Sequence, residues 1–505
     1  MNDTPPPKDH LTSRSPPLSR QIFVNRNLRM DTVKAIGFDM DYTIARYKKV
    51  NIETLAHRLT VEKLVQRGYP EALHDLTYDP TFVIRGLTVD KKLGNVLKLD
   101  RHGHVGQAYH GRRPLSKLER RQAYRNEKLR FDSARFSLVD TYFELPEICL
   151  FADLIDLREN DPSNEAVLGD PWQLFDDIRS CIDEVHRDDS LKAIIKSDLP
   201  HYIEDDPQLA QALHKLRSAG KKLFLLTNSF GAYSAKVMSY ILDDVLPEYP
   251  SWQNYFDLVI VGSGKPGFFT QQEEPITQLD NDFRPILRGV KKIEKGCLYQ
   301  GGNAKALEKL LRCTGEEILY VGDHIYGDIL RSKRNAFWRT ALVVEELEEE
   351  LALSIQTKDA LEQLYHLEAR RRELDDLCNY HRQELSLYQK QIKGQKTVSA
   401  RTQQEGTELK RKRTEAKQEL KRVLKSLETL TASIDDKFNP FWGMVFKLDQ
   451  ENTKFGEQVA RHACLYTSRV SNFLYYSNFQ YFRSPRDLLP HEEGYRRTSS
   501  SPHKT

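Results

Sequence analysis

The sequence predicts an α/β protein with a doubly wound parallel sheet, interrupted by a large insertion and followed by a long helical hairpin. Apolar strand-like segments alternate with helix-like segments over residues 221–344, which is the rhythm of a parallel sheet. The first two strands are separated by about 180 residues, too many for one crossover connection. From Ala360 onward the chain is rich in charged residues, with apolar residues at helical spacing.

The first strand is predicted at Val33–Phe38, and it leads directly into two acidic residues, Asp39 and Asp41. Ligands bind at the carboxyl edge of an open α/β sheet, where such residues lie. Two carboxylates so close repel each other unless a cation or a proton lies between them, and Mg²⁺ accepts both carboxylate and phosphate oxygens. We therefore expect Asp39 to attack phosphorus and form an aspartyl phosphate, and Asp41 to act as general acid and base. An Asp-x-Asp-x-Thr string also arises by chance in roughly 6% of chains this long.

The insertion contains both strand and helix patterns. Gly86–Ala108 alternates in the manner of hairpin strands, and Asp170–Lys192 has helical periodicity. The periodic apolar positions are Leu174, Ile178, Ile182 and Val185. We interpret residues 51–214 as an inserted domain.

After the insertion the chain returns to strands and helices in turn. The predicted strands are Lys221–Thr227, Phe256–Val261, Ile318–Val321 and Thr340–Val344, and the predicted helices are Ser234–Leu246 and Asn303–Leu311. Together with the first strand, these elements predict a core formed by residues 21–50 and 215–350.

Polar residues of complementary chemistry follow the later strands. Thr227 offers a hydroxyl for a phosphoryl oxygen, Lys265 offers a cation, and Asp323 and Asp328 offer further carboxylates for a Mg²⁺ shell. Because the ends of parallel strands meet at one edge, we expect these residues to join Asp39. Each also has a plainer interpretation, since Thr227 can cap the turn after its strand and the two aspartates can cap the next helix.

The loop around Lys265 formally matches the glycine fingerprint of dinucleotide-binding folds, in Gly262-Ser263-Gly264-Lys265-Pro266-Gly267. That interpretation fails on context, because Pro266 would break the helix that such a loop must begin. The loop does not match a phosphate-binding Walker loop either, since no Ser or Thr follows Lys265. We therefore expect Lys265 to act as a cation.

The region 356–435 is predicted to be an antiparallel helical hairpin with a heptad seam. Its first helix places apolar residues at Leu364, Leu367, Leu374, Cys378, Leu385, Tyr388 and Ile392, and its second at Leu409, Ala416, Leu420, Val423, Leu427, Leu430 and Ile434. Arg371 and His381 interrupt the seam, and Gly394–Gly406 is predicted to be the turn. The hairpin is either an arm for self-association or a strut packed on its own body or a sister subunit. The aromatic-rich segment at 438–492 is expected to pack on the core.

The composition favours a cytoplasmic protein. Lys and Arg total 76 against 73 Asp and Glu, so the net charge of +3 does not predict a polyanion or a membrane surface as partner. The six cysteines have no paired spacing, which disfavours a disulfide framework or a zinc site. Residues 1–20 read as a disordered lead and 493–505 as a disordered tail, and no segment is long and apolar enough to span a bilayer.

The order of DMDYT, LLTNS, GSGKP and VGDHIYGD resembles the four motifs of the haloacid dehalogenase-like superfamily of aspartate-nucleophile phosphatases. The resemblance implies a Rossmann-like phosphatase core with an inserted cap domain. The catalytic residues are then expected to be Asp39, Asp41, Thr227 and Lys265. The Mg²⁺ ligands are expected to be Asp39, Asp41, Asp323 and Asp328.

From Arg20 to about Glu493 the chain is also similar to the cytosolic purine 5′-nucleotidase family, through DMDYTIARY, TNSFGAYSAKVMSYI, GDHIYGDILRSK and NFLYYSNFQYFRS. This similarity implies Mg²⁺-dependent hydrolysis of purine nucleoside monophosphates such as IMP and GMP, with phosphoryl transfer to a second nucleoside as a further option. We also expect a homo-oligomer. The alternatives are a phosphatase of the same superfamily that acts on another phosphate ester, and a scaffold protein that uses the hairpin.

The similarity extends to the residues that hold the substrate. The expected substrate contacts are Phe143, Arg179, Asp183, His186, Lys192, Asn228 and Ser229. Arg179 and Asp183 share one helix face, so together they can hold the edge of a purine ring, or they can form an ordinary surface ion pair. Phe143 matches an aromatic residue that stacks on the base, which is worth roughly 1–3 kcal/mol, or it is a core residue.

A nucleotide effector is a further possible ligand of this family. Asp140 stands where the family has an effector-binding Asn, and its charge would repel phosphate, whereas Tyr326 keeps the aromatic position that stacks on the effector's base. A basic segment over residues 112–130 is interpreted as a solvated cap face or subunit contact, with nucleic-acid binding as the less favoured alternative. Its members are Arg112, Arg113, Lys117, Arg120, Arg121, Arg125, Lys128 and Arg130.

Overall fold

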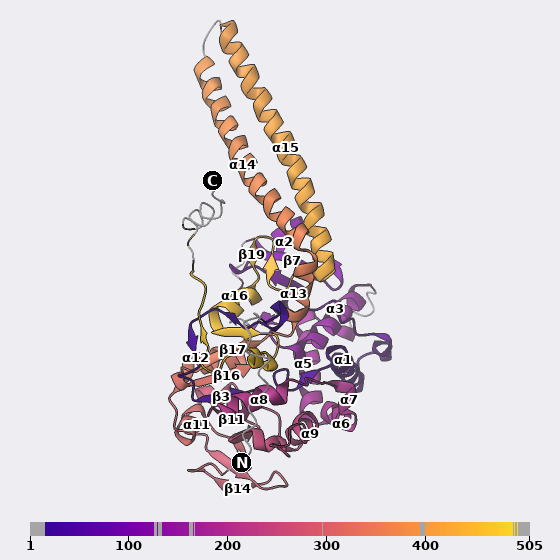
Figure 1. Cartoon of the computed structure of the whole chain (residues 1–505). Coiled ribbons are helices and arrows are strands. Elements are labelled where there is room, and N and C mark those ends of the chain that lie inside the picture. Colours follow the sequence, from indigo (N-terminus) through magenta and orange to yellow (C-terminus); the bar gives the residue numbers. More distant parts are fainter. Residues whose placement is uncertain are drawn as a thin grey trace, which may run out of the picture. The chain divides into compact units, whose positions relative to one another are not determined.

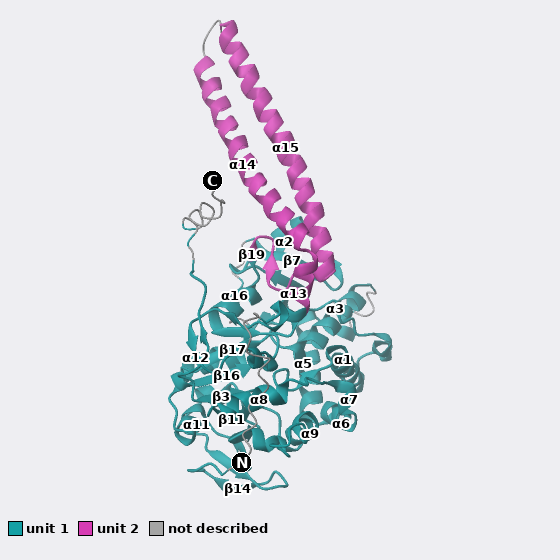
Figure 2. Cartoon of the chain, in the orientation of Figure 1, with its two compact units in different colours: residues 1–348, 452–505 teal, residues 349–451 magenta. Residues whose placement is uncertain are grey.

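The computed structural model describes residues 16–125, 129, 134–160, 165, 167–294, 296–393, 399–487, 489 and 492. The chain divides into two compact units, Met1–Glu348 with Asn452–Thr505, and Glu349–Glu451 (Figure 2). Residues 1–15 of the predicted lead, the whole predicted tail 493–505, and Lys128 and Arg130 of the basic segment lie outside the described residues. The end of the lead is described and forms a short 3-10 helix, Leu18–Arg20.

The first unit is built on a sheet to which ten of the described strands belong, and its central strands are parallel (Figure 1). From one edge to the other the order is β1 (Phe23–Val24), β20 (Leu465–Thr467), β17 (Arg339–Val343), β16 (Ile318–Gly322), β3 (Ala35–Phe38), β11 (Lys222–Leu226), β12 (Leu258–Val261), β15 (Leu298–Gly301), β13 (Ile276–Leu279) and β14 (Pro285–Arg288). The strands from β20 to β15 run parallel, and β1, β13 and β14 are antiparallel additions at the edges. The predicted α/β class with a parallel sheet is confirmed.

The two helices predicted between the strands are present with shifted ends, as α9 (Gly231–Leu242) and α11 (Ala304–Leu311). Four further helices were not predicted: α8 (Leu209–Ser218), α10 (Gly267–Thr270), α12 (Arg331–Asn335) and α13 (Glu346–Gln356). The helix α11 begins at a side-chain cap, because Asn303 Oδ1 accepts a hydrogen bond from the Ala306 N–H at 3.0 Å. A one-turn π-helix, η7 (Ile325–Leu330), follows β16 and gives its side chains a different orientation from those of an α-helix.

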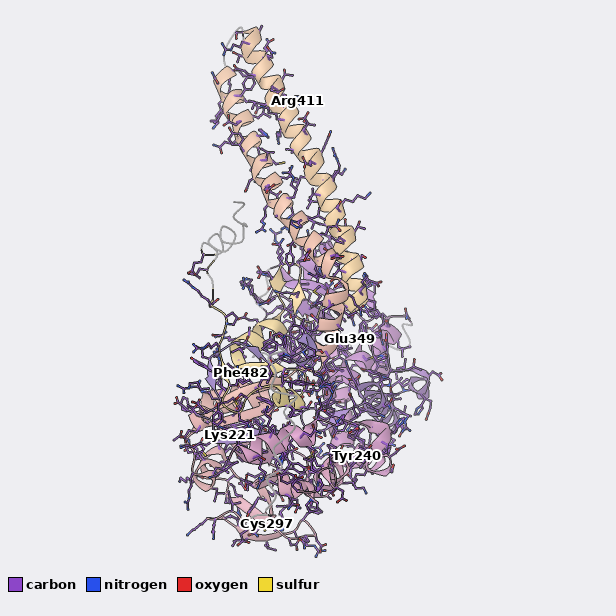
Figure 3. The ribbon with its side chains drawn as sticks, viewed as in Figure 1. Lys221, Tyr240, Cys297, Glu349, Arg411 and Phe482 are labelled. Atoms are coloured by element: carbon purple, nitrogen blue, oxygen red, sulfur yellow. The ribbon has the colours of Figure 1, made fainter. Side chains whose placement is uncertain are left out.

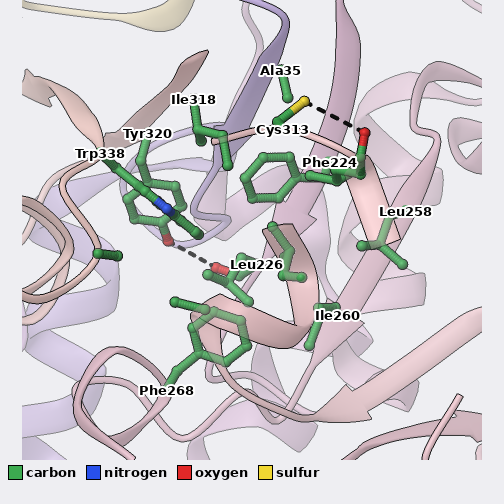
Figure 4. Close-up of a cluster of buried hydrophobic side chains, with 14 of the residues drawn as sticks. Ala35, Phe224, Leu226, Leu258, Ile260, Phe268, Cys313, Ile318, Tyr320 and Trp338 are labelled. Atoms are coloured by element: carbon green, nitrogen blue, oxygen red, sulfur yellow. Dashed lines mark hydrogen bonds between the residues drawn. The ribbon is translucent and has the colours of Figure 1, made fainter. Parts of the chain in front are cut away.

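A cluster of buried aromatic and aliphatic side chains packs around the central strands (Figure 4). Phe224, Tyr320 and Trp338 are buried together, and the Tyr320 hydroxyl donates to the Leu226 carbonyl at 3.1 Å. Gly37 makes this packing possible, because a Cβ at that position would lie 2.1 Å from Phe224 Cζ. The core therefore fixes the central strands that lead into the site.

The inserted region contains a second sheet and a group of helices. The sheet joins β5 (Thr88–Asp90), β6 (Asn95–Leu99), β7 (Val105–His110), β8 (Arg113–Pro114) and β9 (Phe136–Leu138). The helices are α1 (Lys49–Gln66), α2 (Lys117–Tyr124), α3 (Leu145–Asn160), α5 (Pro171–Arg187), α6 (Ser190–Ser197) and α7 (Leu199–Tyr202). The single helix predicted at Asp170–Lys192 was too long, since α5 ends at Arg187 and Asp189 turns the chain with a φ of 67°. In the basic segment, Arg112 and Arg113 are paired with carboxylates.

The second unit contains the two long helices predicted near the C-terminus, α14 (Lys358–Ile392) and α15 (Ala400–Phe438), which pack side by side (Figure 1). The predicted turn was misplaced, because α15 already begins at Ala400 and residues 394–398 lie outside the described residues. Gly406 is a helical residue, and a Cβ there would lie 2.2 Å from Tyr388 Cζ, so this glycine admits the tyrosine ring. His381, expected to interrupt the seam, is buried within it. Figure 3 shows the charged side chains of the hairpin, including Arg411, which pairs with Glu408 and Glu415.

Two expectations from composition can be compared with the structure. In the described part of the chain no helix has the length and apolarity required to cross a bilayer. All six cysteines are free thiols.

The aromatic-rich segment is divided between the units. Its residues up to Glu451 belong to the second unit and those from Asn452 belong to the first, where Phe473 and Phe482 are buried.

Candidate active site

Asp39 lies at the carboxyl end of β3, where its backbone N–H still donates to the Val321 carbonyl of β16 at 2.9 Å. Its Oδ1 accepts a hydrogen bond from the Met40 N–H at 2.8 Å and lies 2.9 Å from Lys265 Nζ. The side chain is 12% exposed, so it is largely shielded from bulk water. This position suits a nucleophile whose direction of attack is fixed by the main chain.

Lys265 lies between two of the predicted acids. Its Nζ donates to Asp328 Oδ1 at 2.8 Å and to the Tyr320 hydroxyl at 3.0 Å, in addition to its contact with Asp39. Burial alone would lower the pKa of Lys265, but Asp328 and Asp39 outweigh burial and hold that pKa well above its usual value. The neighbouring carboxylates therefore favour the charged form of Lys265 at the centre of the site.

Asp323 and Asp328 complete an acidic group with Asp39, in which ligand oxygens from all three residues lie within 4.8 Å of one another. Asp328 approaches closely because Gly322 has no side chain, and a Cβ there would lie 2.6 Å from Asp328 Oδ2. The loop between them is shaped by His324, whose Nδ1 accepts a hydrogen bond from the Gly327 N–H at 3.1 Å.

The charges of this group suit a divalent cation. Burial, opposed by Lys265, raises the pKa of Asp39 to about 8, and burial with the neighbouring Asp328 and Asp39 raises that of Asp323 well above its usual value. Three carboxylates and one ammonium group leave two net negative charges when all are ionised. A hard ion with oxygen ligands, such as Mg²⁺, fits this donor set.

Asp41 has different surroundings from the other acids. Its Oδ1 accepts a hydrogen bond from the Tyr47 hydroxyl at 2.5 Å, and its Oδ2 accepts one from Ser229 Oγ at 2.8 Å. Tyr47 in turn lies 2.9 Å from the Tyr233 hydroxyl. Asp41 was expected among the Mg²⁺ ligands, but its carboxylate is not part of the close group formed by Asp39, Asp323 and Asp328. Two hydroxyl donors hold both of its oxygens in place.

Thr227 and Asn228 shape the loops around Lys265. The Thr227 hydroxyl accepts a hydrogen bond from the Ser229 N–H at 3.1 Å, so it caps the turn after β11. Asn228 Oδ1 accepts from the Lys265 N–H at 2.7 Å, and its Nδ2 donates to the Lys265 carbonyl at 3.0 Å. Asn228 was predicted to contact substrate, and in the structure its amide holds the lysine loop in place.

Phe143 and His186 lie together in the inserted region. Their ring centres are 5.1 Å apart and nearly perpendicular, and Phe143 also meets the Tyr42 ring edge-on at 4.9 Å. Burial lowers the pKa of His186 to about 4, with Lys192 adding to the effect, so the imidazole is neutral at pH 7. Tyr42 follows Asp41 directly, so these rings connect the inserted region to the acidic turn.

The predicted pairing of Arg179 with Asp183 is not seen. The Arg179 guanidinium donates to Glu144 Oε1 at 2.9 Å and lies 2.9 Å from Glu147 Oε1. Asp183 is exposed, and within the described part of the chain no hydrogen bond or ion pair reaches its carboxylate. Lys192 Nζ lies 5.3 Å from the centre of the Tyr233 ring, a cation–π contact.

The two residues connected with an effector are also located. Asp140 is 6% exposed and lies 3.4 Å from His324 Nδ1, and burial raises the pKa of Asp140 to about 6, although His324 opposes the rise. The Tyr326 hydroxyl accepts a hydrogen bond from Gln458 Nε2 at 2.9 Å.

Several residues near the site were missed from the sequence. Tyr320, Tyr47 and Tyr233 contribute hydroxyls, and Glu144 and Glu147 contribute the partners of Arg179. Tyr47 lies in the stretch that marks the first motif, so it could have been found there. The two glutamates could not be found from sequence spacing. Glu147 lies on α3, which packs against α5, and Glu144 lies just before α3, so both meet Arg179 only in the folded chain.

The chain was compared with known proteins. A model of the 5′ nucleotidase family matches residues 22–494. The chain is 31% identical to a 5′-nucleotidase domain-containing protein of Dictyostelium discoideum over 490 residues, covering 95% of this chain and 76% of that protein. It is 28% identical to 5′-nucleotidase domain-containing protein 2 of Rattus norvegicus, covering 93% of this chain and 80% of that protein.

Solved structures with similarity include a putative beta-phosphoglucomutase of Thermotoga maritima, with 14% identity and a TM-score of 0.24 over 62% of this chain and 86% of that chain. L-2-haloacid dehalogenase of Xanthobacter autotrophicus has 13% identity and a TM-score of 0.21 over 62% of this chain and 78% of that chain. The family match extends over nearly all of the described residues, including the acidic turn, the Lys265 loop and the Asp323–Asp328 loop. The chain belongs to the 5′-nucleotidase family.

Proposed function

We propose that this phosphoric monoester hydrolase removes the 5′-phosphate from purine nucleoside monophosphates such as IMP and GMP, with Mg²⁺ as cofactor and Asp39 as nucleophile. The observation that supports it most is the close group of Asp39, Asp323 and Asp328 around Lys265, at the carboxyl edge of a parallel sheet. Membership of the 5′-nucleotidase family supports the nucleotide class of substrate.

In the first step a carboxylate oxygen of Asp39 forms a bond to phosphorus, and the bond from phosphorus to the 5′ oxygen of the nucleoside breaks. Asp41 gives its proton to that leaving oxygen, so a neutral nucleoside departs. Ser229 and Tyr47 hold both oxygens of the Asp41 carboxylate, which fixes the direction of the proton transfer. Lys265 balances the negative charge that develops on the phosphoryl oxygens.

In the second step water attacks phosphorus, Asp41 takes the proton from that water, and the bond between phosphorus and Asp39 breaks. Phosphate leaves, and both aspartates return to their starting states. The turn that carries Asp41 is fixed by Tyr42, which is buried among aromatic rings with a φ of 52°. The same carboxyl group can therefore serve as acid and then as base without a change of backbone.

Asp39, Asp323 and Asp328 would hold Mg²⁺, which supplies charge neutralisation for the phosphate and favours the ionised form of the buried acids. In the absence of the ion, burial and the neighbouring carboxylates raise the pKa of Asp39 to about 8, which favours its protonated form. Lys265 alone does not compensate for three buried carboxylates. The nucleophile is thus expected to be active only with the metal bound.

The purine part of the proposal depends on the inserted region, which we propose acts as a cap. Phe143 presents an aromatic ring that a base can stack on, and Lys192 and Arg179 supply positive charge nearby. Asp183 is exposed, so its carboxylate is available to accept hydrogen bonds from the N–H groups of hypoxanthine or guanine. A homo-oligomer, a nucleotide effector and phosphoryl transfer to a second nucleoside stay predictions.

A phosphatase for another phosphate ester is the second candidate. It is favoured by one observation. Glu144 and Glu147 pair with the guanidinium of Arg179 and partly neutralise its charge, so less positive charge is available to a ligand. The two candidates share the catalytic group and differ only in what the cap recognises.

A substrate panel separates the candidates. The purified chain is assayed with Mg²⁺ on IMP, GMP, CMP, UMP and a sugar phosphate, and kcat/KM is compared. The proposal expects the purines to be preferred, and it expects Asp183→Ala to lose that preference while retaining hydrolysis of the other esters. Equal rates on all compounds, or no change in preference with Asp183→Ala, would contradict the assignment of the base site.

A further inference from the structure

Arg85 lies in the inserted region, yet it is bonded to the loop of a candidate metal ligand. Its Nη1 donates to the main-chain carbonyl of Asp323 at 3.1 Å. The two residues are separated by 238 positions in the sequence, so only the fold brings them together. A bond to the carbonyl restrains the peptide from which the Asp323 side chain extends.

The guanidinium is fixed on every side. Glu346 accepts two parallel hydrogen bonds, from Arg85 Nε and Nη2, each at 2.7 Å. The Tyr142 ring lies against the guanidinium at 4.1 Å and the Phe455 ring at 5.1 Å, and the Tyr142 hydroxyl also donates to Glu346. Arg85 is 1% exposed, so the planar fork has a single orientation.

The backbone beside Arg85 is adapted to this arrangement. Gly86 has a φ of 88°, which favours glycine, and a Cβ there would lie 2.4 Å from Phe455 Cβ. A larger residue would push the chain away from Phe455 and withdraw the arginine. Gly86 therefore allows Phe455 to pack closely against the backbone next to Arg85.

We propose that Arg85 is a positioning residue for the metal site: it holds the Asp323 main chain so that the carboxylate group is ready to bind Mg²⁺. This inference rests on the proposed function, because it takes Asp323 as a Mg²⁺ ligand. Residues that orient metal ligands without touching the metal typically change metal affinity about 10–100-fold when they are replaced.

The same side chain connects the metal loop to the predicted base site. Tyr142, which stacks on Arg85, precedes Phe143 and packs against Tyr42 at 4.7 Å. A change at Arg85 therefore raises KM for the nucleotide as well as the Mg²⁺ requirement. A residue that served only the stability of the fold would change neither.

The test compares Arg85→Lys with Arg112→Lys in the full chain. Both substitutions keep the charge and remove a planar fork that binds both oxygens of a carboxylate and stacks on a ring. The carboxylate and ring are Glu346 and Tyr142 for Arg85, and Asp153 and Phe82 for Arg112, which also pairs with Asp79 at 3.1 Å. Arg112 has no hydrogen bond or ion pair to the candidate metal ligands within the described residues, so it controls for loss of stability.

The readout is the unfolding midpoint as a function of Mg²⁺ concentration, together with the Mg²⁺ needed for half-maximal hydrolysis. Arg85→Lys is expected to raise both half-saturation concentrations about 10–100-fold, and Arg112→Lys to leave them unchanged. If Arg85→Lys does not fold, Glu346→Gln, which keeps the arginine and weakens its support, is expected to change both in the same direction.

The substitution Asp323→Asn separates the positioning role of Arg85 from the proposed metal site on which that role depends. If Asp323→Asn loses the Mg²⁺ response while Arg85→Lys keeps a normal half-saturation, the positioning role is wrong and the metal site stands. If Asp323→Asn retains the full Mg²⁺ response, the proposed metal site itself is overturned, and the role of Arg85 with it.

Discussion

Lys265 offers the sharpest test of the electrostatics of the site, through the substitution Lys265→Met. In the structure its ammonium group lies 2.9 Å from Asp39, 2.8 Å from Asp328 and 3.0 Å from the Tyr320 hydroxyl, with a side chain that is 4% exposed. Removing one partner from a buried ion pair costs about 3–5 kcal/mol, because the remaining charge stays buried and unpaired. The variant without metal is therefore expected to unfold at a clearly lower urea concentration.

Mg²⁺ should reverse part of this loss. Without the ammonium group, the cation meets three carboxylates and no competing positive charge, so it is expected to bind more tightly than in the unaltered protein. Each tenfold gain in affinity adds about 1.4 kcal/mol of stability at saturating metal. Hydrolysis moves in the opposite direction and is expected to fall about 100–1000-fold, because the charge that opposes the phosphoryl oxygens is lost.

The assay follows urea unfolding by the fluorescence of Trp338, which is buried beside Tyr320, with and without Mg²⁺. The same unfolding curve measured with Trp338→Phe gives the fluorescence change of the other tryptophans, which is subtracted. The reasoning is refuted if Mg²⁺ stabilises Lys265→Met no more than it stabilises the unaltered chain, or if the variant keeps its rate of hydrolysis.

Three further predictions concern the acid, a buried carboxyl and the core. Ser229→Ala removes the hydrogen bond from Ser229 Oγ to Asp41 Oδ2 and is expected to lower kcat about tenfold, the value of one bond to a charged group; an unchanged kcat would contradict the role of this hydroxyl. Burial raises the pKa of Glu53 to about 7, so the folded state holds a proton that the unfolded state releases near pH 4.5, and stability falls by about 3 kcal/mol between those values. Glu53→Gln removes that fall, and urea midpoints measured at pH 5 and pH 8 should change less than in the unaltered chain. Gly37→Ala would place a methyl group 2.1 Å from Phe224 Cζ and is expected to destabilise the fold by at least about 1–3 kcal/mol, which an unchanged urea midpoint would disprove.

The strand ends were predictable from sequence because parallel strands bring their carboxyl ends to one edge. Asp39, Thr227 and Lys265 follow β3, β11 and β12, which are neighbours in the sheet, and Asp328 follows β16 on the other side of β3. A short apolar run followed by a polar residue can be recognised in the sequence. The parallel order of the strands then brings these polar residues together.

The proposed base site was less predictable because the contacts of its residues are long-range. Helical spacing suggested Asp183 as the partner of Arg179, four positions away, yet the guanidinium bonds to Glu144 and Glu147 on neighbouring elements. Arg85 gave no signal at all, since its carboxylate partner Glu346 is 261 residues distant.

Some strands were missed for a simpler reason. The strand β15, Leu298–Gly301, contains a polar residue and a glycine and has no apolar run, and β14 is exposed along its whole length. Gly406 was interpreted as part of a turn, although it lies within α15 and admits the Tyr388 ring. For β15 and Gly406, a partner elsewhere in the fold overrides the local preference of the residues, whereas β14 is held by its pairing with β13.

The most direct test of the central proposal is to identify the phosphorylated residue during turnover. The protein is mixed with IMP and Mg²⁺, quenched in acid within one turnover, and digested for peptide mass spectrometry, with Asp39→Asn as the control. The proposal predicts phosphate on Asp39, and neither phosphate nor turnover in the control. Phosphate on a different residue, or hydrolysis that survives Asp39→Asn, would contradict it.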